Sequence, residues 1–502
     1  DHFIADLKKA KEDERVKGIF LEPINIAAAP STLLDMRKAI EDFRSSGKFV
    51  VAYAENYGQP EYYIASAADE VYMYPEGLMD WRGMNAEIMF YKKLFDKLGV
   101  EAQVVRGPNN KFKSAVEPYI YDHMSDENRM QLQTFISDIW NTMLEGISKS
   151  RGVEVAALNS YADSLTFVSP QAVLDSKLIN GLRYRDEVIA SLKGKVGLAA
   201  TDDDDELNLV KLAKYHDKAV DDADGSGKDR VAVVYAVGAI ESGEGDDQTI
   251  GSDRIAGALK RAREDDKVKA IVLRVNSPGG SALASDVIWR EMILAKKAKP
   301  VVASMGDYAA SGGYYISCAA DSIVAEPTTI TGSIGVFGLM FNAQKMFNNK
   351  LGITFDTVKT GRFADMGSMT RPMREDERAM IEQEIEKVYD VFITHVSEGR
   401  RISKAAVDSI GQGRVWTGLE AINIGLVDKI GTLEDAVAMA AKLARLDNYR
   451  VVPLPRQKEF FEVLMEDFST EAETYFAKRE LGESYRYYAE IKKLVQQQGI
   501  MA

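Results

Sequence analysis

Short apolar runs alternate with longer amphipathic segments along most of the chain. Between residues 230 and 327 the apolar runs are "RVAVVYAVGAI" (230–240), "VKAIVLRV" (268–275), "KPVVASM" (299–305) and "SIVAEP" (322–327). Segments such as "DRIAGALKRAREDD" (253–266), with the spacing of an amphipathic helix, lie between them. This alternation is typical of an α/β domain whose sheet is largely parallel and covered by helices.

The same pattern occurs twice. The segment "EDERVKGIFL" (12–21) matches "EDDKVKAIVL" (264–273) at an offset of 252 (264 − 12), and "YYIASAADEV" (62–71) matches "YYISCAADSI" (314–323) at the same offset (314 − 62). A third pair, "KLGV" at 97 and "KLGI" at 350, follows in the same order. Three matches in one order predict two copies of one fold.

The repeats divide the chain into four predicted parts. These are an N-terminal repeat (1–195), an acidic linker (196–228), a C-terminal repeat (229–445) and a helical C-terminal tail (446–502). The strand predicted at 230–240 has no counterpart in the N-terminal repeat, because Asp1 aligns with Asp253. We therefore expect the first strand of that repeat, and whatever precedes it, to lie upstream of this chain.

Composition excludes several classes of function. The 502 residues carry a net charge of −14, which argues against a nucleic-acid-binding surface. One cysteine, Cys318, cannot form an intrachain disulfide. The apolar runs are far shorter than the ~20 residues of a membrane helix. We expect no metal and no cofactor, since the chain has neither a His/Cys cluster nor a GxxxxGK[ST] phosphate loop.

Ser311 is the first candidate for chemistry. It lies in "GDYAASGGYYIS" (306–317), between an apolar run and a predicted helix, and its neighbours are small. One interpretation is a plain N-cap of that helix. The other is a nucleophile that a sharp turn exposes near a helix N-terminus, where negative charge is favoured. The local sequence does not decide between them.

Comparison of the repeats singles out the C-terminal copy. Residues 311–313 ("SGG") align with 59–61 ("QPE"), and Gly279 and Gly280 of "NSPGGSA" align with two alanines at 27–28. A glycine turn after a buried strand can direct backbone N–H groups at the oxyanion of a tetrahedral intermediate. It can equally be an ordinary turn. The C-terminal repeat alone has both the serine and the glycine pairs.

A nucleophilic serine needs a base, and the best candidate is Lys113. The four histidines lie in a terminus, the linker or polar helical segments, and no GxSxG motif surrounds Ser311. Lys113 lies in "NKFKSAVEPY" (110–119), and alignment of Pro118 with Pro372 places a glycine, Gly367, at its position in the C-terminal repeat. A lysine can act as a base when burial lowers its pKa. Otherwise it is a solvated surface charge.

Four motifs together resemble a known family. They are "NSPGGSA" (276–282), "DYAASGGYYIS" (307–317), "TGSIGV" (331–336) and "KFKSAVEP" (111–118). The chain is similar over nearly its whole length to the long, tandem-repeat form of the signal peptide peptidase A family, serine–lysine peptidases with the Clp protease and crotonase fold. The resemblance implies the following roles: nucleophile, Ser311; general base, Lys113; oxyanion donors, Gly279 and Gly280; orientation of the lysine, Ser333. An ordinary turn serine is the other interpretation of Ser333.

The resemblance also implies a setting for this chemistry. Such enzymes degrade signal-peptide remnants and other apolar peptides, so we expect an apolar cleft. The segment "GVFGLMF" (335–341) could line this cleft or could equally belong to the core. They form ring- or bowl-shaped homo-oligomers, with a tetramer as the expected form. An N-terminal anchor, absent from this chain, holds them in the bacterial inner membrane, facing the periplasm. Two alternatives remain: a crotonase-like enzyme acting on acyl thioesters, and a non-catalytic scaffold that only builds a ring.

Overall fold

The computed structural model describes residues 2–198, 207–219, 227–455 and 499–501, and it divides into two compact units. The first unit comprises residues 1–86, 133–226 and 326–329, and the second comprises 87–132, 227–325 and 330–502. This division differs from the predicted boundaries at 195 and 229. Residues 87–132 come from the N-terminal repeat in sequence, yet they pack with the C-terminal repeat.

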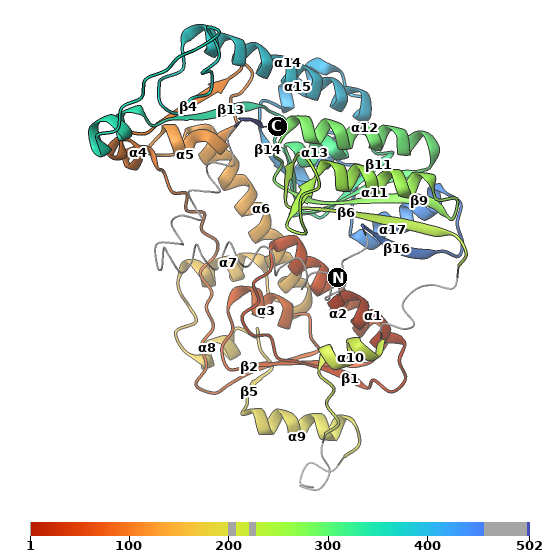
Figure 1. The fold of residues 1–502 in the computed structure, drawn as a ribbon. Helices are drawn as coiled ribbons and strands as arrows, with labels where there is room; N and C mark the ends of the chain where they lie inside the picture. Colours follow the sequence, from red (N-terminus) through yellow and green to blue (C-terminus); the bar gives the residue numbers. More distant parts are fainter. Residues whose placement is uncertain (1, 199–206, 220–226, 456–498, 502) are drawn as a thin grey trace. The chain divides into compact units, whose positions relative to one another are not determined.

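A parallel sheet forms the centre of the first unit (Figure 1). Its strand order is β1 (Gly18–Leu21), β2 (Phe49–Ala54), β3 (Glu70–Met73) and β5 (Gly181–Leu182). The helices of this unit are α1 (His2–Glu12), α2 (Pro30–Arg44), α3 (Gln59–Ala65), α6 (Asp126–Arg151, which begins in the second unit), α7 (Val155–Asp163), α8 (Pro170–Asp175), α9 (Arg185–Lys195) and α10 (Leu212–Ala219). Part of the predicted linker is thus a helix, α10, whose His216 contacts Asp6 of α1 at 2.9 Å.

The second unit is built on a larger sheet with the order β14-β12-β10-β9-β6-β16, in which β11 pairs with β10 and β15. The strands are β6 (Arg230–Val237), β9 (Val268–Ser277), β10 (Val301–Ala310), β11 (Ser322–Ala325), β12 (Ile330–Gly332), β14 (Val415–Thr417), β15 (Lys429–Ile430) and β16 (Arg450–Leu454). Every pairing in it is parallel except that of β12 with β14. The predicted α/β class with mainly parallel sheets is confirmed.

Helices cover both faces of this sheet. One face packs against α11 (Ser252–Glu264), α12 (Ala282–Ala298), α13 (Gly312–Ser317) and α14 (Glu375–Arg400). The other packs against α17 (Leu433–Leu443), which lies across the sheet from α11 and α12 (Figure 1). The short helices α15 (Lys404–Ile410) and α16 (Gly418–Asn423) and the strands β7 (Ala239–Glu241) and β8 (Thr249–Gly251) complete this part. Strands β9 and β10 are buried along most of their length, which explains their apolar sequences.

A small antiparallel sheet, β17-β13-β4, also belongs to the second unit. It consists of β4 (Glu101–Arg106), β13 (Phe337–Asn342) and β17 (Gly499–Met501), and the elements near it include α4 (Lys92–Leu98), η1 (Ser114–Val116), α5 (Glu117–Ile120) and η3 (Met346–Leu351). The C-terminal tail, which was predicted to be helical, thus contributes two strands. Residues 450–454 form β16, which pairs with β6, and residues 499–501 form β17, which pairs with β13. Residues 456–498 of that tail lie outside the described residues.

Within the described part of the chain, no helix combines the length and apolarity needed to cross a bilayer.

The duplication is visible in matching hydrogen bonds. The Tyr62 hydroxyl donates to the Leu178 carbonyl at 2.7 Å, and the equivalent Tyr314 hydroxyl donates to the Leu426 carbonyl at 2.9 Å. Both tyrosines are fully buried. Each bond ties the helix that follows β2 or β10, which is α3 or α13, to the chain that enters β5 or β15.

A second pair of bonds repeats the same design. The backbone N–H of Val71 donates to the Asn180 side chain at 2.9 Å, and that of Ile323 donates to the Asp428 carboxylate at 2.7 Å. In both units a polar side chain thus accepts a hydrogen bond from the backbone of the strand that follows this helix, β3 or β11. The sequence matches at offset 252 therefore reflect one fold built twice.

We predict that Tyr62→Phe and Tyr314→Phe each destabilise the unit that contains them. Either change leaves a buried carbonyl without its donor, which costs on the order of 1–3 kcal/mol. Thermal unfolding followed by circular dichroism should show a midpoint lowered by several degrees. Tyr184→Phe, at a half-exposed position, is the matched control and should leave the midpoint in place. An unchanged midpoint in both buried variants would contradict the assigned anchoring role.

Candidate active site

Ser311 lies at the sharp turn between β10 and α13. Its backbone adopts φ 57° and ψ −118°, a region that non-glycine residues rarely occupy. The turn is held by the Ser311 N–H, which donates to the Gly332 carbonyl at 2.8 Å. The side chain makes no capping hydrogen bond to the helix and is 5% exposed. The hydroxyl is therefore not an N-cap group, although the residue occupies that position.

The glycines after Ser311 allow close packing against the turn that follows β9. A Cβ at Gly313 would lie 2.7 Å from the Ser277 carbonyl oxygen, and one at Gly312 would lie 2.6 Å from the Ser285 hydroxyl. Both distances are shorter than real Cβ contacts. The pair is thus needed for α13 to begin directly beside residues 277–280.

Lys113 reaches Ser311 from the segment that joins β4 to η1. Its Nζ lies 2.7 Å from the Ser311 Oγ, 3.1 Å from the Ser333 carbonyl oxygen and 3.2 Å from the Ser333 Oγ. All three residues belong to the second unit. The structure therefore brings together three side chains that the sequence places in three separate motifs.

Burial changes the acidity of this amine. Lys113 is 4% exposed, and desolvation, which disfavours the ammonium form, lowers its pKa to about 7. The Phe337 ring, with its centroid 5.9 Å from the Nζ, forms part of the apolar surroundings. A substantial fraction of Lys113 is therefore a neutral amine near neutral pH, which is the form that can accept a proton.

Two glycines that the sequence interpretation missed shape the lysine site. A Cβ at Gly413, whose φ is 79°, would lie 2.6 Å from the Lys113 Cα, and a Cβ at Gly335 would lie 3.3 Å from its Cδ. The Phe112 N–H donates to the Gln412 carbonyl at 2.9 Å, which fixes the lysine segment against the same loop. The two glycines of "GQG" (411–413) are visible in the sequence, but only the fold shows that this loop packs against Lys113.

Gly279 and Gly280 differ in the structure. The Gly279 N–H donates to the Ser277 hydroxyl at 3.1 Å, whereas the Gly280 N–H has no acceptor among the described residues. Gly280 lies beside the start of α13, since a Cβ at Gly312 would be 3.2 Å from its nitrogen. Gly312 is the first residue of that helix, where N–H groups have no acceptor within the helix. The free donors near Ser311 thus come from Gly280 and Gly312, and the sequence interpretation missed Gly312.

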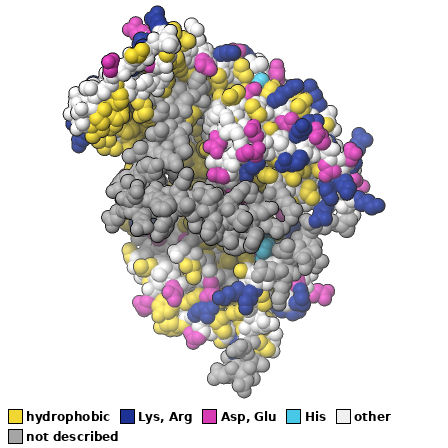
Figure 2. Space-filling model, in the orientation of Figure 1, with side chains coloured by type: hydrophobic (Ala, Val, Ile, Leu, Met, Phe, Trp, Pro, Cys, Tyr) yellow, Lys and Arg dark blue, Asp and Glu magenta, His cyan; other side chains and the backbone are white. Residues whose placement is uncertain are grey.

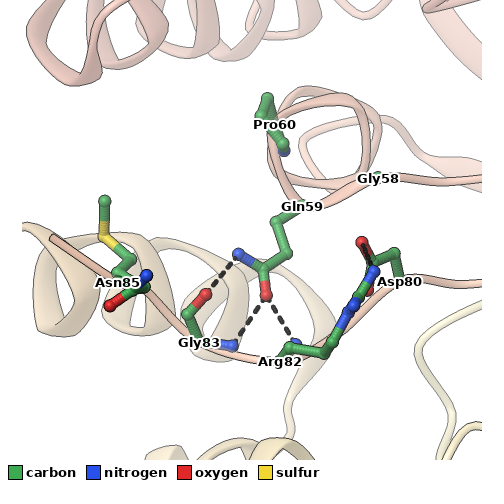
Figure 3. A pocket seen from close by; sticks show the side chains of 8 residues that line it. Gly58, Gln59, Pro60, Asp80, Arg82, Gly83 and Asn85 are labelled. Carbon is green, nitrogen blue, oxygen red and sulfur yellow. Dashed lines mark hydrogen bonds and ion pairs between the residues drawn. The ribbon is translucent and has the colours of Figure 1, made fainter. Parts of the chain in front are cut away.

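The equivalent turn of the N-terminal repeat has no hydroxyl nucleophile. Gln59 takes the place of Ser311, and its Oε1 accepts hydrogen bonds from the N–H groups of Arg82 (2.7 Å) and Gly83 (2.8 Å), as Figure 3 shows. The Gln59 Nε2 donates to the Gly83 carbonyl at 3.0 Å. Gln59 lines a pocket of about 390 Å³ in the first unit. Its amide side chain thus bonds to backbone groups through both the Oε1 and the Nε2.

The histidines have other partners. Their contacts are His123 with Asp122, His216 with Asp6, His395 with Asp286 and Trp289, and His2 with His216. Among the described residues, no three His, Cys, Asp or Glu side chains are grouped as a metal ion would require. The lysine is therefore the basic group that contacts Ser311.

Comparisons with known proteins identify the family to which this chain belongs. The model of peptidase family S49 matches residues 42–199 and 293–447, one segment in each repeat, and the Clp protease model matches residues 229–329. Protease 4 of Salmonella typhi is 40% identical over 455 residues, which cover 89% of this chain and 72% of that protein. Protease 4 of Haemophilus influenzae is 37% identical over 87% of this chain and 72% of its own length.

A plant protein is similar over the same span. The chloroplastic serine protease SPPA of Arabidopsis thaliana is 34% identical over 452 residues, which cover 89% of this chain and 66% of that protein. Both repeats thus match the family model, and the relatives match across both repeats. The chain belongs to peptidase family S49, and it is a serine peptidase with a Clp-protease-like fold.

Proposed function

We propose that the chain is a serine endopeptidase in which Ser311 is the nucleophile and Lys113 the general base. The observation that carries this proposal is the 2.7 Å contact between the Lys113 Nζ and the Ser311 Oγ in a buried site. A nucleophile and a base within hydrogen-bond distance are the minimum for this chemistry. The lowered pKa of Lys113 supports the role of the base.

Ser333 orients the base in this mechanism. A neutral amine has two N–H groups and one lone pair, and the Lys113 Nζ lies within hydrogen-bond distance of both oxygen atoms of Ser333. When its two N–H groups donate to those oxygens, the lone pair is left to accept the hydroxyl proton of Ser311. Ser333 therefore acts as a positioning residue.

The reaction follows from these contacts. Lys113 accepts the proton of Ser311 as the Oγ attacks the substrate carbonyl carbon, and the resulting ammonium returns a proton to the leaving amine as the C–N bond breaks. The N–H groups of Gly280 and Gly312 donate to the oxyanion, while Gly279 shapes the turn. Lys113 then accepts a proton from a water molecule that attacks the acyl-enzyme, and the carboxylic acid leaves as Ser311 regains its proton.

Apolar peptides are the proposed substrates. Three exposed hydrophobic side chains lie on segments that lead to the site: Val237 at the end of β6, Leu283 after the glycine turn and Tyr308 before Ser311. Val237 pairs with Asn276 in the sheet, and the Tyr308 N–H donates to the Asn276 side chain at 3.0 Å. These side chains offer apolar surface to a peptide that approaches Ser311.

We propose that cleaved signal peptides are among these substrates. A relative from Enterococcus faecium, 40% identical over 39% of this chain, is named a putative signal peptide peptidase SppA, which supports this choice. In the proposed setting the enzyme acts outside the cytoplasm. It is held at the bacterial inner membrane and faces the periplasm.

Labelling by a fluorophosphonate probe tests the dyad. We expect the wild-type chain to react at Ser311, Ser311→Ala to give no adduct, and Lys113→Met to react at least 100-fold more slowly, the range that loss of a general base produces. Intact-mass spectrometry measures the adduct. Lys111→Met, which removes an exposed lysine two residues away, is the matched control and should label at the wild-type rate. Full labelling of Lys113→Met would remove the lysine as the base.

The rate of peptide cleavage should depend on the protonation state of Lys113. Because only neutral Lys113 accepts a proton, kcat/KM on an apolar peptide should rise with pH through about 7 and level off above pH 8. A polar peptide of the same length should be a poorer substrate at every pH. A rate that is independent of pH between 6 and 8 would contradict the assignment of Lys113.

Lys113 also makes stability depend on pH. Its native pKa of about 7 lies below the usual 10.5, so the unfolded chain binds a proton that the native chain does not between these values. The wild type therefore loses stability relative to Lys113→Met as pH falls from 10.5 to 7, by about 1.4 kcal/mol for each unit of pKa shift. Urea unfolding at pH 6, 8 and 10 measures the difference. A constant difference across this range would show that Lys113 is not desolvated.

A further inference from the structure

Lys113 lies in an environment that lysine side chains usually avoid. Figure 2 shows Lys and Arg side chains, beside Asp and Glu side chains, on the surface of the molecule. Among the residues that the structure describes, Lys113 is the one lysine that is buried. Burial of an ammonium group without a counter-charge is unfavourable, because the charge loses its hydration. The chain around Lys113 must therefore be held closed by its neighbours.

The side chain of Gln131 contacts the residues on both sides of Lys113. Gln131 lies on α6, in the part of that helix that belongs to the second unit, and is 6% exposed. Its Nε2 donates to the Phe112 carbonyl at 3.2 Å and to the Ser114 hydroxyl at 2.6 Å. A third contact, at 3.3 Å, is with the Asn128 Oδ1 of the same helix. One amide nitrogen thus spans the position of the lysine along the chain.

The oxygen of the same amide contacts β14. The Gln131 Oε1 accepts a hydrogen bond from the Val415 N–H at 3.2 Å. Val415 pairs with Gly332 in the sheet, and the Gly332 carbonyl accepts the Ser311 N–H at 2.8 Å. Gln131 therefore links the segment that carries the lysine to the strands that hold the turn at Ser311.

The loop that precedes β14 also holds Ser333. The Ser333 N–H donates to the Arg414 carbonyl at 2.7 Å, and the Gly413 N–H donates to the Ile334 carbonyl at 2.7 Å. Gln131 contacts the next residue of this loop. The lysine segment and the oxygens that contact its amine are thus fixed against the same stretch of backbone.

Comparison of the repeats indicates that the glutamine accompanies the lysine. Helices α6 and α14 both have 26 residues, and their first residues align at an offset of 249 (375 − 126). The segment "DENRMQ" (126–131) then aligns with "EDERAM" (375–380), which places Met380 at the position of Gln131. Met380 is 48% exposed. The repeat that has a glycine in place of the lysine thus also lacks the glutamine.

We propose that Gln131 is a positioning residue that holds Lys113 against Ser311 and keeps the surrounding segment closed. This inference rests on the proposed roles of Lys113 as the base and Ser311 as the nucleophile. Gln131 acts through residues 112–114 and through the backbone of Val415, and it takes no part in the transfer of the proton.

The charged groups around this segment do not replace the glutamine. Desolvation lowers the pKa of Lys113. The nearby charged side chains have partners of their own: Lys111 with Glu127, Glu117 with Asn128, and Arg414 with the Phe112 ring. A change at Gln131 should therefore act on Lys113 through the hydration of its amine and not through a lost ion pair.

The pH dependence of fluorophosphonate labelling at Ser311 tests this role. Gln131→Met introduces the residue that α14 has at this position and removes all polar contacts of the amide. We expect the midpoint of labelling to move from about 7 upward by about one pH unit, because water then stabilises the ammonium form of Lys113. At pH 7 this shift lowers the neutral fraction, and with it the labelling rate, about fivefold. At pH 10 the amine is neutral in both proteins, so a folded variant should label at a rate close to that of the wild type.

Two further variants define the contact. Gln133→Met, at an exposed glutamine of the same helix whose amide bonds to Ser137, is the matched control and should keep the wild-type midpoint. Ser114→Ala removes one partner of the Gln131 amide. Its shift and that of Gln131→Met should not add in the double variant, because both changes break the same hydrogen bond.

The possible outcomes separate this inference from the proposed chemistry. An unchanged midpoint in Gln131→Met, or a rate reduced equally at every pH, would overturn the inference and leave the roles of Lys113 and Ser311 in place. Labelling of the otherwise wild-type chain that does not require Lys113 would remove the proposed base, and this inference with it.

Discussion

The chemistry proposed for this protein depends on keeping one lysine amine out of water. In the proposed mechanism Lys113 acts on Ser311 as a neutral base, because its surroundings disfavour the ammonium form. That condition explains features that otherwise look unrelated. The glycines at 335 and 413 leave room for the lysine chain, and the backbone bond between Phe112 and Gln412 holds its loop in place. The oxygens of Ser333 supply the polar contacts that a buried amine still needs.

The two repeats divide this task unequally. The C-terminal repeat supplies the sheet, the strained turn at Ser311 and the glycine donors, whereas the N-terminal repeat contributes the segment that carries Lys113. The pairing of β4 with β13 makes that segment part of the second unit. In the first unit, Gln59 occupies the position of Ser311 and is bound by backbone groups. The first unit thus has an amide side chain, bonded to backbone groups, where the second unit has a hydroxyl.

Much of this arrangement could be predicted from the sequence, because duplication made the differences visible. The parallel α/β class followed from the apolar pattern, and Ser311 and Lys113 were singled out by what each repeat lacks. The unit boundaries and β16 could not be predicted, since they depend on strand pairings between residues far apart in the chain. Gly279 and Gly280 look equivalent in sequence, and only the bond from Gly279 to Ser277 distinguishes them. The role of Gly413 depends on a contact with a residue 300 positions earlier (413 − 113).

The distance along the chain between the two proposed catalytic groups has a consequence for biosynthesis. Lys113 and Ser311 are 198 residues apart, and translation at roughly 5–20 residues per second separates their synthesis by about 10–40 seconds. During that interval the nascent chain holds the proposed base without the proposed nucleophile. Even after Ser311 emerges, the loop around Gly413 and strand β14 must still be made before the lysine can be enclosed. A peptidase built in this way remains inert on the ribosome until nearly all of its fold is complete.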